Sequence, residues 1–207
     1  KLDNDRIFDE KKYYLVTGGM GGLGKKLIAW MKENGAEKFI VTTRTNNLVQ
    51  DENIITIKTN LLDLEDLKNK LDKYEIDGIF HLAGSINDKF VKDIIQEDIN
   101  DSFDVKVKGI QNLGTLFELK NHTYFVAFSS IVSLIGNPGQ SIYSAANSYM
   151  DEYCKIRNNS GLPGLSINLG AIGGCGIIHQ DFTLAETMMS NGIDFTVYYS
   201  FFEKFKY

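Results

Sequence analysis

The alternation of apolar and polar positions along the chain predicts strands separated by helices. Short apolar runs bounded by glycine or polar residues indicate buried strands, and they occupy residues 13–17, 38–42, 54–57, 78–82, 124–129 and 165–169. Apolar residues at helical spacing predict helices between them, one that ends near residue 34 and others over residues 64–71, 99–119 and 143–157. Strands that are apolar throughout need cover on both faces. We therefore expect an α/β protein with a doubly wound parallel sheet and helices on both faces.

The composition is that of a soluble globular protein. The chain has 207 residues, of which 43% are hydrophobic and 24% charged, and this length fits one domain. The net charge of −5 argues against nucleic-acid binding, which needs a basic patch. No apolar run approaches the roughly 20 residues of a membrane span, and the charged start, KLDNDRIFDEKK, does not resemble a signal peptide. We expect a cytoplasmic protein that binds no membrane.

The cysteines and histidines predict no metal site. Cys154 and Cys175 form no CxxC pair, and the three histidines lie far apart in the sequence without metal-ligand spacing. We therefore expect buried thiols without a disulfide framework, and ordinary histidines.

A glycine-rich turn follows the first predicted strand and precedes the first predicted helix. It comprises Thr17, Gly18, Gly19, Met20, Gly21, Gly22, Leu23 and Gly24. The segment fits both GxGxxG and TGxxxGxG, which are weak patterns by themselves because glycines also occupy ordinary tight turns. Between a strand and a helix, such a turn lets the backbone approach a pyrophosphate, whose charge then faces the helix N-terminus. We interpret it as the dinucleotide-binding turn of a Rossmann-like sheet.

Arg44 indicates which dinucleotide binds. It stands near the end of the second strand, about 20 residues beyond the glycines, where an NAD site usually has Asp or Glu. A guanidinium pairs well with a 2′-phosphate, and no acidic residue stands there to repel it. Arg44 therefore favours NADPH over NADH. The alternative is that Arg44 is only a solvated surface charge.

Ser130, Tyr143 and Asn147 are the candidates for chemistry. Ser130 follows an apolar strand at its carboxyl end, and Tyr143 and Asn147 lie four residues apart on one helical face. A carbonyl that accepts hydride needs a proton donor and a hydrogen bond to its developing oxyanion, which Tyr and Ser supply. A phenol with a pKa near 10 also needs a nearby cation. Position 147 is not the lysine found there in many reductases.

Further motifs accompany the glycine turn and Arg44. They are His81-Leu82-Ala83-Gly84, Lys106-Val107-Lys108-Gly109, Asn112-Leu113, Phe128-Ser129-Ser130, Gly136-Asn137-Pro138-Gly139-Gln140, Tyr143-Ser144-Ala145-Ala146-Asn147 and Asn168-Leu169-Gly170. With them, roughly residues 13–195 of the chain resemble the ketoreductase domain of modular polyketide and fatty acid synthases, a branch of the short-chain dehydrogenase/reductase superfamily. In that family the Lys and Asn of the catalytic tetrad exchange places. Lys106 is the matching lysine, and Lys108 fits the pattern less well.

The resemblance implies a role for each site residue. Tyr143 donates the proton, and Ser130 hydrogen-bonds the carbonyl oxygen. Lys106 lowers the tyrosine pKa and binds the nicotinamide ribose, while Asn147 supports the proton relay. Cofactor contacts are implied for the whole glycine turn and for Arg44, Asn60, Leu61, Ala83, Gly84, Lys106 and Tyr143. Taken singly, Asn147 as a solvent-facing residue and Ser130 as a turn residue are the structural alternatives.

The implied function is the NADPH-dependent reduction of a β-ketoacyl thioester on an acyl carrier protein, in polyketide or fatty acid biosynthesis. Other synthase domains are then partners. The alternatives are an α-ketoacyl reductase of a peptide synthetase module and a structural remnant that binds cofactor without turnover; a nucleotide-sugar epimerase is disfavoured by Asn147. We expect residues 1–12 to be a linker or the end of a preceding subdomain, and residues 13–207 to be a catalytic domain excised from a larger synthase.

The chain departs from the family pattern at three places. Asn60 replaces the usual Asp after the third strand, which keeps a hydrogen bond to the adenine and drops a charge. Asp88 is all that remains of the Leu-Asp-Asp sequence found in enzymes that give the D-hydroxyl product, and Ile135 replaces the Trp of the opposite class. These residues favour the D product.

The last part of the chain carries two further predictions. Residues 170–192 contain several glycines and Met188-Met189, the composition of a hinged lid over a substrate; a surface loop is the alternative. Apolar residues at helical spacing over residues 197–205 predict a core-facing helix.

Overall fold

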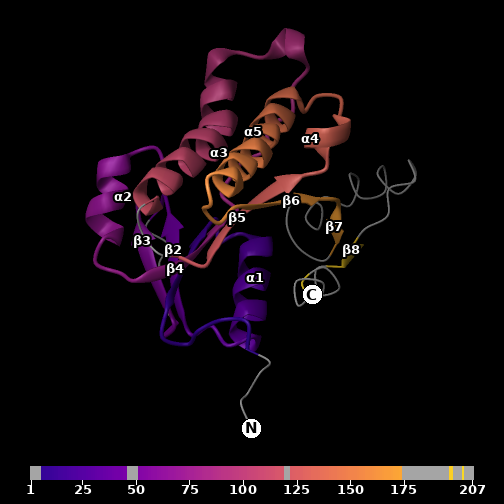
Figure 1. Cartoon of the computed structure of the whole chain (residues 1–207). Coiled ribbons are helices and arrows are strands. Elements are labelled where there is room, and N and C mark those ends of the chain that lie inside the picture. Colours follow the sequence, from indigo (N-terminus) through magenta and orange to yellow (C-terminus); the bar gives the residue numbers. More distant parts are fainter. Residues whose placement is uncertain (1–5, 46–50, 119–121, 174–195, 198–201, 203–207) are drawn as a thin grey trace.

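Six strands form one parallel sheet in the computed structural model, which describes residues 6–45, 51–118, 122–173, 196–197 and 202 (Figure 1). The strands are β1 (Tyr13–Thr17), β2 (Lys38–Thr43), β3 (Ile54–Lys58), β4 (Ile76–His81), β5 (Tyr124–Ser130) and β6 (Leu165–Leu169). Their order is β3-β2-β1-β4-β5-β6, with every neighbouring pair parallel. The order reverses between β1 and β4, so the sheet is doubly wound. The predicted fold class is confirmed.

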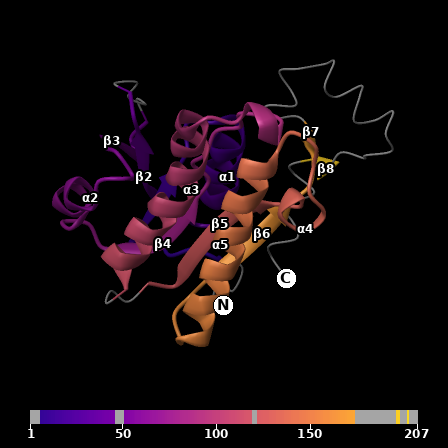
Figure 2. The same cartoon turned by 90° about the horizontal axis from the view of Figure 1, so that it is seen from above.

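Helices cover both faces of this sheet (Figures 1 and 2). They are α1 (Gly22–Glu33), α2 (Leu64–Leu71), the 3₁₀ helix η1 (Val91–Asp93), α3 (Gln96–Phe117), α4 (Val132–Ile135) and α5 (Ser141–Asn159). Helix α1 packs against one face in a cluster that includes Trp30 and Met31. Helices α2, α3 and α5 pack against the other face through Leu67, Phe117 and Met150. The carboxyl ends of the strands lie at one rim between these layers, where ligands of such sheets bind.

Helix α3 begins at Gln96, three residues before the predicted start. The Asp98 carboxylate accepts a 3.0 Å hydrogen bond from the Ile95 N–H. It thereby satisfies one of the donors left free at the helix start. The spacing of apolar residues does not reveal such a cap, because the capping side chain is polar and lies inside the first turn of the helix. The predicted end at residue 119 lies outside the described residues.

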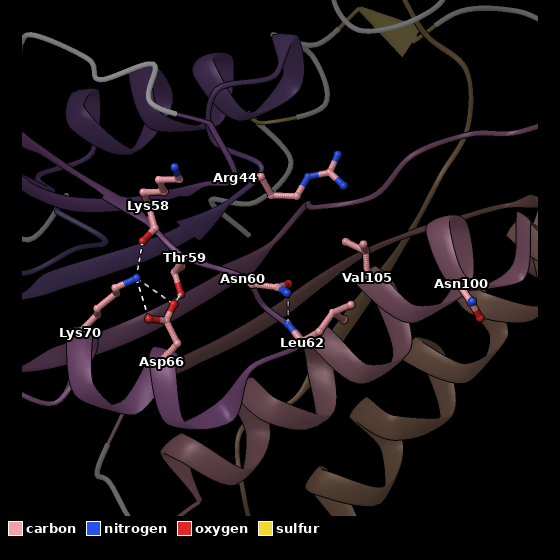
Figure 3. A pocket seen from close by; sticks show the side chains of 9 residues that line it. All are labelled: Arg44, Lys58, Thr59, Asn60, Leu62, Asp66, Lys70, Asn100 and Val105. Atoms are coloured by element: carbon pink, nitrogen blue, oxygen red, sulfur yellow. Dashed lines mark hydrogen bonds and ion pairs between the residues drawn. The ribbon is translucent and has the colours of Figure 1, made fainter. Parts of the chain in front are cut away.

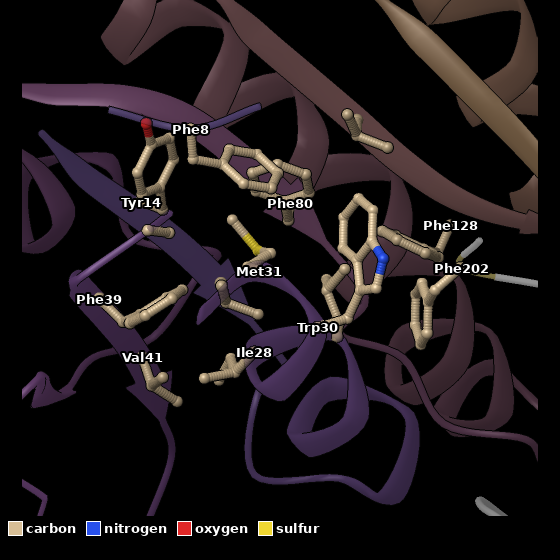
Figure 4. Close-up of a cluster of buried hydrophobic side chains, with 14 residues drawn as sticks. Phe8, Tyr14, Ile28, Trp30, Met31, Phe39, Val41, Phe80, Phe128 and Phe202 are labelled. Atoms are coloured by element: carbon tan, nitrogen blue, oxygen red, sulfur yellow. The ribbon is translucent and has the colours of Figure 1, made fainter. Parts of the chain in front are cut away.

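The core on the α1 face includes a residue that precedes β1 (Figure 4). Phe8 is 5% exposed, and its ring centroid lies 5.2 Å from that of Tyr14 and 5.7 Å from that of Trp30. Its N–H donates to the Asn34 carbonyl at 3.1 Å. We expected a linker or a preceding subdomain over residues 1–12. In this segment, Ile7 and Phe8 pack as part of the same core.

The segment after β6 is described only in part. Strands β7 (Ile172–Gly173) and β8 (Thr196–Val197) pair in parallel. Most of the predicted lid, with both of its methionines, lies in residues 174–195, outside the described residues. Val197 lies in a strand, so the helix predicted over residues 197–205 does not begin there. Phe202 is buried and stacks on Trp30 at 5.6 Å between ring centroids.

Two further observations concern membrane spans and metal sites. Within the described ranges, no helix combines the length and the apolar character needed to cross a bilayer. In the same parts of the chain, no group of three His, Cys, Asp or Glu side chains is placed to hold a metal ion. Cys154 is a buried free thiol, and Cys175 lies outside the described residues.

Candidate active site

The glycine turn allows a close approach to its backbone. Gly18 has a φ of +73°, and a Cβ there would lie 2.8 Å from the Ala83 nitrogen. A Cβ on Gly24 would lie 2.5 Å from the Gly18 carbonyl oxygen. Both positions therefore require glycine. Gly21, the N-cap of α1, has no side chain to cap the first N–H groups of the helix, which leaves those donors to a phosphate.

Thr17 supports this turn from behind. Its side chain is fully buried, its Oγ1 lies 2.7 Å from His81 Nδ1, and it accepts a 3.3 Å hydrogen bond from the Ala83 N–H. Burial, followed by the charge of Lys106, lowers the pKa of His81 to about 3, so the imidazole is neutral. Neither Thr17 nor Gly19 lines the two cavities described below. Their contribution to a cofactor site is to shape the turn.

The first cavity, of about 270 Å³, opens at the ends of β1, β2 and β3. The predicted cofactor residues that line it are Gly18, Met20, Arg44, Asn60, Leu61, Ala83 and Gly84. The Asn60 Oδ1 accepts a 3.1 Å hydrogen bond from the Leu62 N–H, so the side-chain NH₂ group remains as the donor to a ligand. This position at the strand ends fits the adenosine half of a dinucleotide.

Arg44 lies between this cavity and a neighbouring one of about 480 Å³ (Figure 3). Its exposed guanidinium extends above Asn60 and Val105 and has no ion-pair partner among the described residues. Lys70, in the same neighbouring cavity, is by contrast held by Asp66 at 2.8 Å. Arg44 is therefore a cation that borders both cavities and is placed to pair with a phosphate group.

A second cavity, of about 450 Å³, continues from the first towards the catalytic candidates. The two cavities share Gly18, Ala83 and Gly84. Of the predicted site residues, the second is lined by Gly18, Gly21, Gly22, Leu23, Gly24, Ala83, Gly84, Lys106, Ser130 and Tyr143. A single path thus runs from Arg44 to Tyr143 across the carboxyl ends of the strands, as an extended dinucleotide requires.

This second cavity is also lined by residues that were not predicted for the site. They are Leu82, Ile86, Phe128, Ser129, Leu169, Gly170 and Ile172. Most of them follow the last residue of β4 or flank the ends of β5 and β6, and that position was the signal that could have found them.

Lys106 enters the second cavity from the middle of α3. It is 3% exposed, and its Nζ lies 5.4 Å from the centroid of the Tyr143 ring and donates to the Phe128 carbonyl at 3.4 Å. Burial lowers the pKa of Lys106 to about 8, and the charge of Asp151 acts in the opposite direction. A Cβ on Gly84 would lie 2.8 Å from the Lys106 Cε, so the glycine makes room for the lysine.

Tyr143, from α5, and Ser130, from the end of β5, interact through their side chains. Burial raises the pKa of Tyr143, while hydrogen bonds with Asn147 and Ser130 act in the opposite direction. The phenol is therefore protonated at neutral pH and able to donate a proton. The resemblance implied that Lys106 lowers this pKa, but in the structure the net direction is upward and burial is the largest cause.

Asn147 lies one turn after Tyr143 and is fully buried, so the alternative that it faces solvent is wrong. Its Nδ2 donates to the Tyr143 carbonyl at 2.8 Å. Its Oδ1 has no hydrogen-bond partner among the described residues, and such a buried acceptor fits a site for a bound water. Ser130 Oγ accepts a hydrogen bond from the Val132 N–H at 3.4 Å. Ser130 therefore bonds the backbone as a turn residue does, and it also lines the cavity.

The geometry fits a nicotinamide dinucleotide. The path has room for a ligand along Gly18, Gly21 and Gly24, because glycine has no side chain. Arg44 stands near one end of the path. Lys106 and Tyr143 stand at the other end. A nicotinamide cofactor bound along the path would supply a hydride, and a phenol at this end could supply the proton for the reduction of a carbonyl.

Comparisons with known proteins agree with this geometry. A family model described as KR domain matches residues 13–174. The chain is 30% identical over 201 residues to the highly reducing polyketide synthase GPY1 of Gibberella fujikuroi, covering 90% of this chain and 8% of that protein. It is 29% identical over 204 residues to the hybrid PKS-NRPS synthetase pynA of Aspergillus niger, covering 92% of this chain and 5% of that protein. The chain thus spans less than a tenth of the length of these relatives.

Solved structures share the fold. The first ketoreductase of the tylosin PKS is 27% identical with a TM-score of 0.71, covering 80% of this chain and 40% of that chain. An A-type ketoreductase from a modular polyketide synthase has a TM-score of 0.84 at 23% identity, covering 96% of this chain and 46% of that chain. Because the family model spans most of the sequence, the chain belongs to the KR-domain family, the ketoreductase domains within the short-chain dehydrogenase/reductase superfamily.

Proposed function

We propose that this chain reduces a β-ketoacyl thioester to the β-hydroxyacyl thioester with NADPH, in polyketide biosynthesis. The observation that carries the proposal is the meeting of Tyr143, Ser130 and Lys106 at one end of a path that leads to the glycine turn. Relatives named as polyketide synthases favour this pathway over fatty acid synthesis.

The residues of the chain divide the chemistry between them, with NADPH supplying the hydride. Tyr143 holds the proton for the substrate oxygen at its hydroxyl, and Ser130 Oγ hydrogen-bonds the same oxygen as its charge develops. The Lys106 ammonium stabilises the phenolate that remains after proton transfer. Asn147 Oδ1, buried and available to a water, supports the return of a proton to Tyr143.

Arg44 supports the choice of NADPH. Its guanidinium borders the cavity that fits the adenosine half of the cofactor and has no ion-pair partner among the described residues. A 2′-phosphate would give this cation a bidentate partner, and NADH lacks that group.

The substrate is proposed to arrive on the phosphopantetheine arm of an acyl carrier protein. The relatives are much longer synthases, of which this chain matches a small part. We accordingly propose that other synthase domains are partners of this one. The match to a hybrid PKS-NRPS synthetase keeps an α-ketoacyl thioester as the second candidate substrate.

The test follows NADPH oxidation by the purified protein with two substrates of equal chain length, a β-ketoacyl and an α-ketoacyl thioester of N-acetylcysteamine. The proposal predicts turnover with the β-keto compound at a kcat/KM at least tenfold above that of the α-keto compound. The reverse ratio would support the α-ketoacyl reductase. Binding of NADPH without turnover of either compound would support a structural remnant that only binds cofactor.

A further inference from the structure

Asp151 is the centre of a hydrogen-bond network directly behind the proposed active site. Its Oδ2 accepts hydrogen bonds from Ser133 Oγ at 2.7 Å and from Asn168 Nδ2 at 2.8 Å. Its Oδ1 accepts another from Ser166 Oγ. The donors of these three hydrogen bonds come from helix α4 and strand β6, whereas Asp151 belongs to α5. One carboxylate therefore ties three elements together.

These contacts connect the two residues proposed to hold the substrate oxygen. Tyr143, Asn147 and Asp151 are spaced by four residues and so lie on one face of α5. Ser133 lies three residues after Ser130, and Asn168 Nδ2 donates to Ser133 Oγ at 2.8 Å. The carboxylate thus fixes the rotation and height of the tyrosine helix against the segment that carries the serine.

The carboxylate is charged in this position. Burial pushes the pKa of Asp151 up, but hydrogen bonds from Ser166, Ser133, Ser129 and Asn168 outweigh burial and hold the pKa below its usual value. A buried anion that is satisfied by several donors can act electrostatically on neighbouring groups.

Lys106 is the neighbour on which this charge acts. Three titratable groups interact with the lysine, His81 from β4 and Tyr143 and Asp151 from α5, and the Phe128 carbonyl of β5 accepts a hydrogen bond from its Nζ. The histidine is neutral and the phenol is protonated at neutral pH. The negative charge that favours the Lys106 ammonium therefore comes from Asp151.

We propose that Asp151 is a positioning residue of the reductase, which fixes α5 against the Ser130 segment. Its charge favours the Lys106 ammonium, so the state of this lysine is a readout that a merely structural role would not change. This inference rests on the proposed function, because the positioned groups are those assigned to the reaction. The side chain itself does not line the catalytic cavity, so it acts through the residues that do.

Asp151→Asn tests the proposal, since it keeps the shape of the side chain and removes the charge. The serine hydroxyls can turn to accept from the new amide. We expect kcat to fall by roughly tenfold or more. The pKa of Lys106, followed by NMR of ¹³C-labelled lysine and assigned with Lys106→Arg, should fall by about half a unit or more. Because the pKa is lower, the loss of activity on the alkaline side should begin at a lower pH.

Glu152→Gln is the matched control. It makes the same change at the next residue of α5, where the carboxylate is exposed and pairs with Lys155 at 3.2 Å. This variant should keep the kcat and the Lys106 pKa of the unchanged protein. A folded Asp151→Asn protein with unchanged kcat and unchanged Lys106 pKa would overturn the proposal, even if it were less stable to heat.

Ser166→Ala keeps the proposal testable if Asp151→Asn does not fold. It removes one hydrogen bond to the carboxylate and keeps the charge. We expect a lower kcat with an unchanged Lys106 pKa, and an unchanged kcat would contradict the positioning role. The NMR measurement does not depend on turnover, so it separates the two proposals. If the protein had no reductase activity but the Lys106 pKa still changed in Asp151→Asn, the proposed function would be wrong and the effect of Asp151 on Lys106 would stand.

Discussion

Lys106 and Tyr143 reach one another from different helices, with the lysine Nζ 5.4 Å from the centroid of the tyrosine ring. Helices α3 and α5 lie side by side on one face of the sheet (Figure 2), and Gln111 Nε2 donates across them to the Tyr149 hydroxyl at 2.6 Å. This packing replaces the usual arrangement in which the lysine and the tyrosine share a helix. It gives the phenol a buried cation although position 147 of its own helix holds Asn.

Ionisation of Lys106 should make the activity of the reductase fall at alkaline pH. Its pKa is lowered to about 8, so the ammonium is present below that pH and is lost as the pH rises through it. We expect kcat/KM to fall above about pH 8, because this ratio reports ionisations of the free enzyme. Lys106→Ala should lose both turnover and cofactor affinity, measured by initial rates and by NADPH titration.

Lys108→Ala is the control for this prediction. Lys108 lies on the same helix but is exposed and paired with Asp104 at 2.6 Å. An unchanged pH profile is expected for this variant. If the activity of Lys106→Ala still fell over the same alkaline pH range, the ionisation would belong to another group.

Arg44 should make the protein prefer NADPH. We expect NADPH to bind at least an order of magnitude more tightly than NADH, and Arg44→Ala to remove most of this difference by weakening NADPH alone. Titration calorimetry with both cofactors measures it. Arg6→Ala, which removes an exposed arginine paired with Glu10, should change neither affinity. Equal affinities in the unchanged protein would show that Arg44 is an ordinary surface charge.

The product should have the D configuration at the new hydroxyl. Asp88 accepts hydrogen bonds from Gln140 Nε2 at 2.9 and 3.1 Å, and the Lys89 N–H donates to the Gly139 carbonyl at 2.8 Å. The loop that bears Asp88 is therefore fixed to the turn before the tyrosine helix, where it can guide the substrate arm. Chiral chromatography of the hydroxyacyl product measures the outcome. A predominantly L product would show that Asp88 alone does not determine the face of attack.

Phe8 should contribute to the stability of the domain although it precedes the first strand. Its side chain packs among Tyr14, Trp30 and Phe80, and loss of a buried Phe costs about 3 kcal/mol or more of unfolding free energy. Urea unfolding of Phe8→Ala measures this cost. Phe90→Ala, at a position that is 62% exposed, should cost little. A Phe8→Ala protein as stable as the Phe90→Ala protein would mean that residues 6–12 are a dispensable linker.

Local patterns in the sequence predicted much of the fold. The apolar runs gave β1 and β6 at their observed bounds, because each is a short continuous strand between polar or glycine-rich segments. The start of α3 was missed because the cap that defines it is a hydrogen bond from Ile95 to Asp98. The place of Phe8 in the core was not predicted, because one apolar residue in a charged segment shows no helical or strand periodicity, and residues 1–12 were expected to be a linker or the end of a preceding subdomain.

The parts of the candidate site that depend on nearby residues in the sequence were predicted from local patterns, and the parts that depend on distant residues were not. The glycine turn and Arg44 follow from their distance to predicted strand ends, and the structure brings both to one path. The position of Lys106 came only from the family resemblance, since it is remote in sequence from Tyr143. Asp151 was missed because its hydrogen-bond donors come from other elements, 15 or more residues away in sequence. Its place eight residues after Tyr143 on one helical face was the available signal.

The most direct test of the account compares Tyr143→Phe with Tyr149→Phe in the reduction of a β-ketoacyl thioester. Both changes remove one hydroxyl from α5, but the Tyr149 hydroxyl bonds Gln111 and lies outside the catalytic cavity. We predict that Tyr143→Phe lowers kcat by roughly 10² or more, the scale of general acid catalysis, with NADPH affinity nearly unchanged, and that Tyr149→Phe keeps its turnover. Normal turnover by a Tyr143→Phe protein would contradict the account and place the proton donor elsewhere.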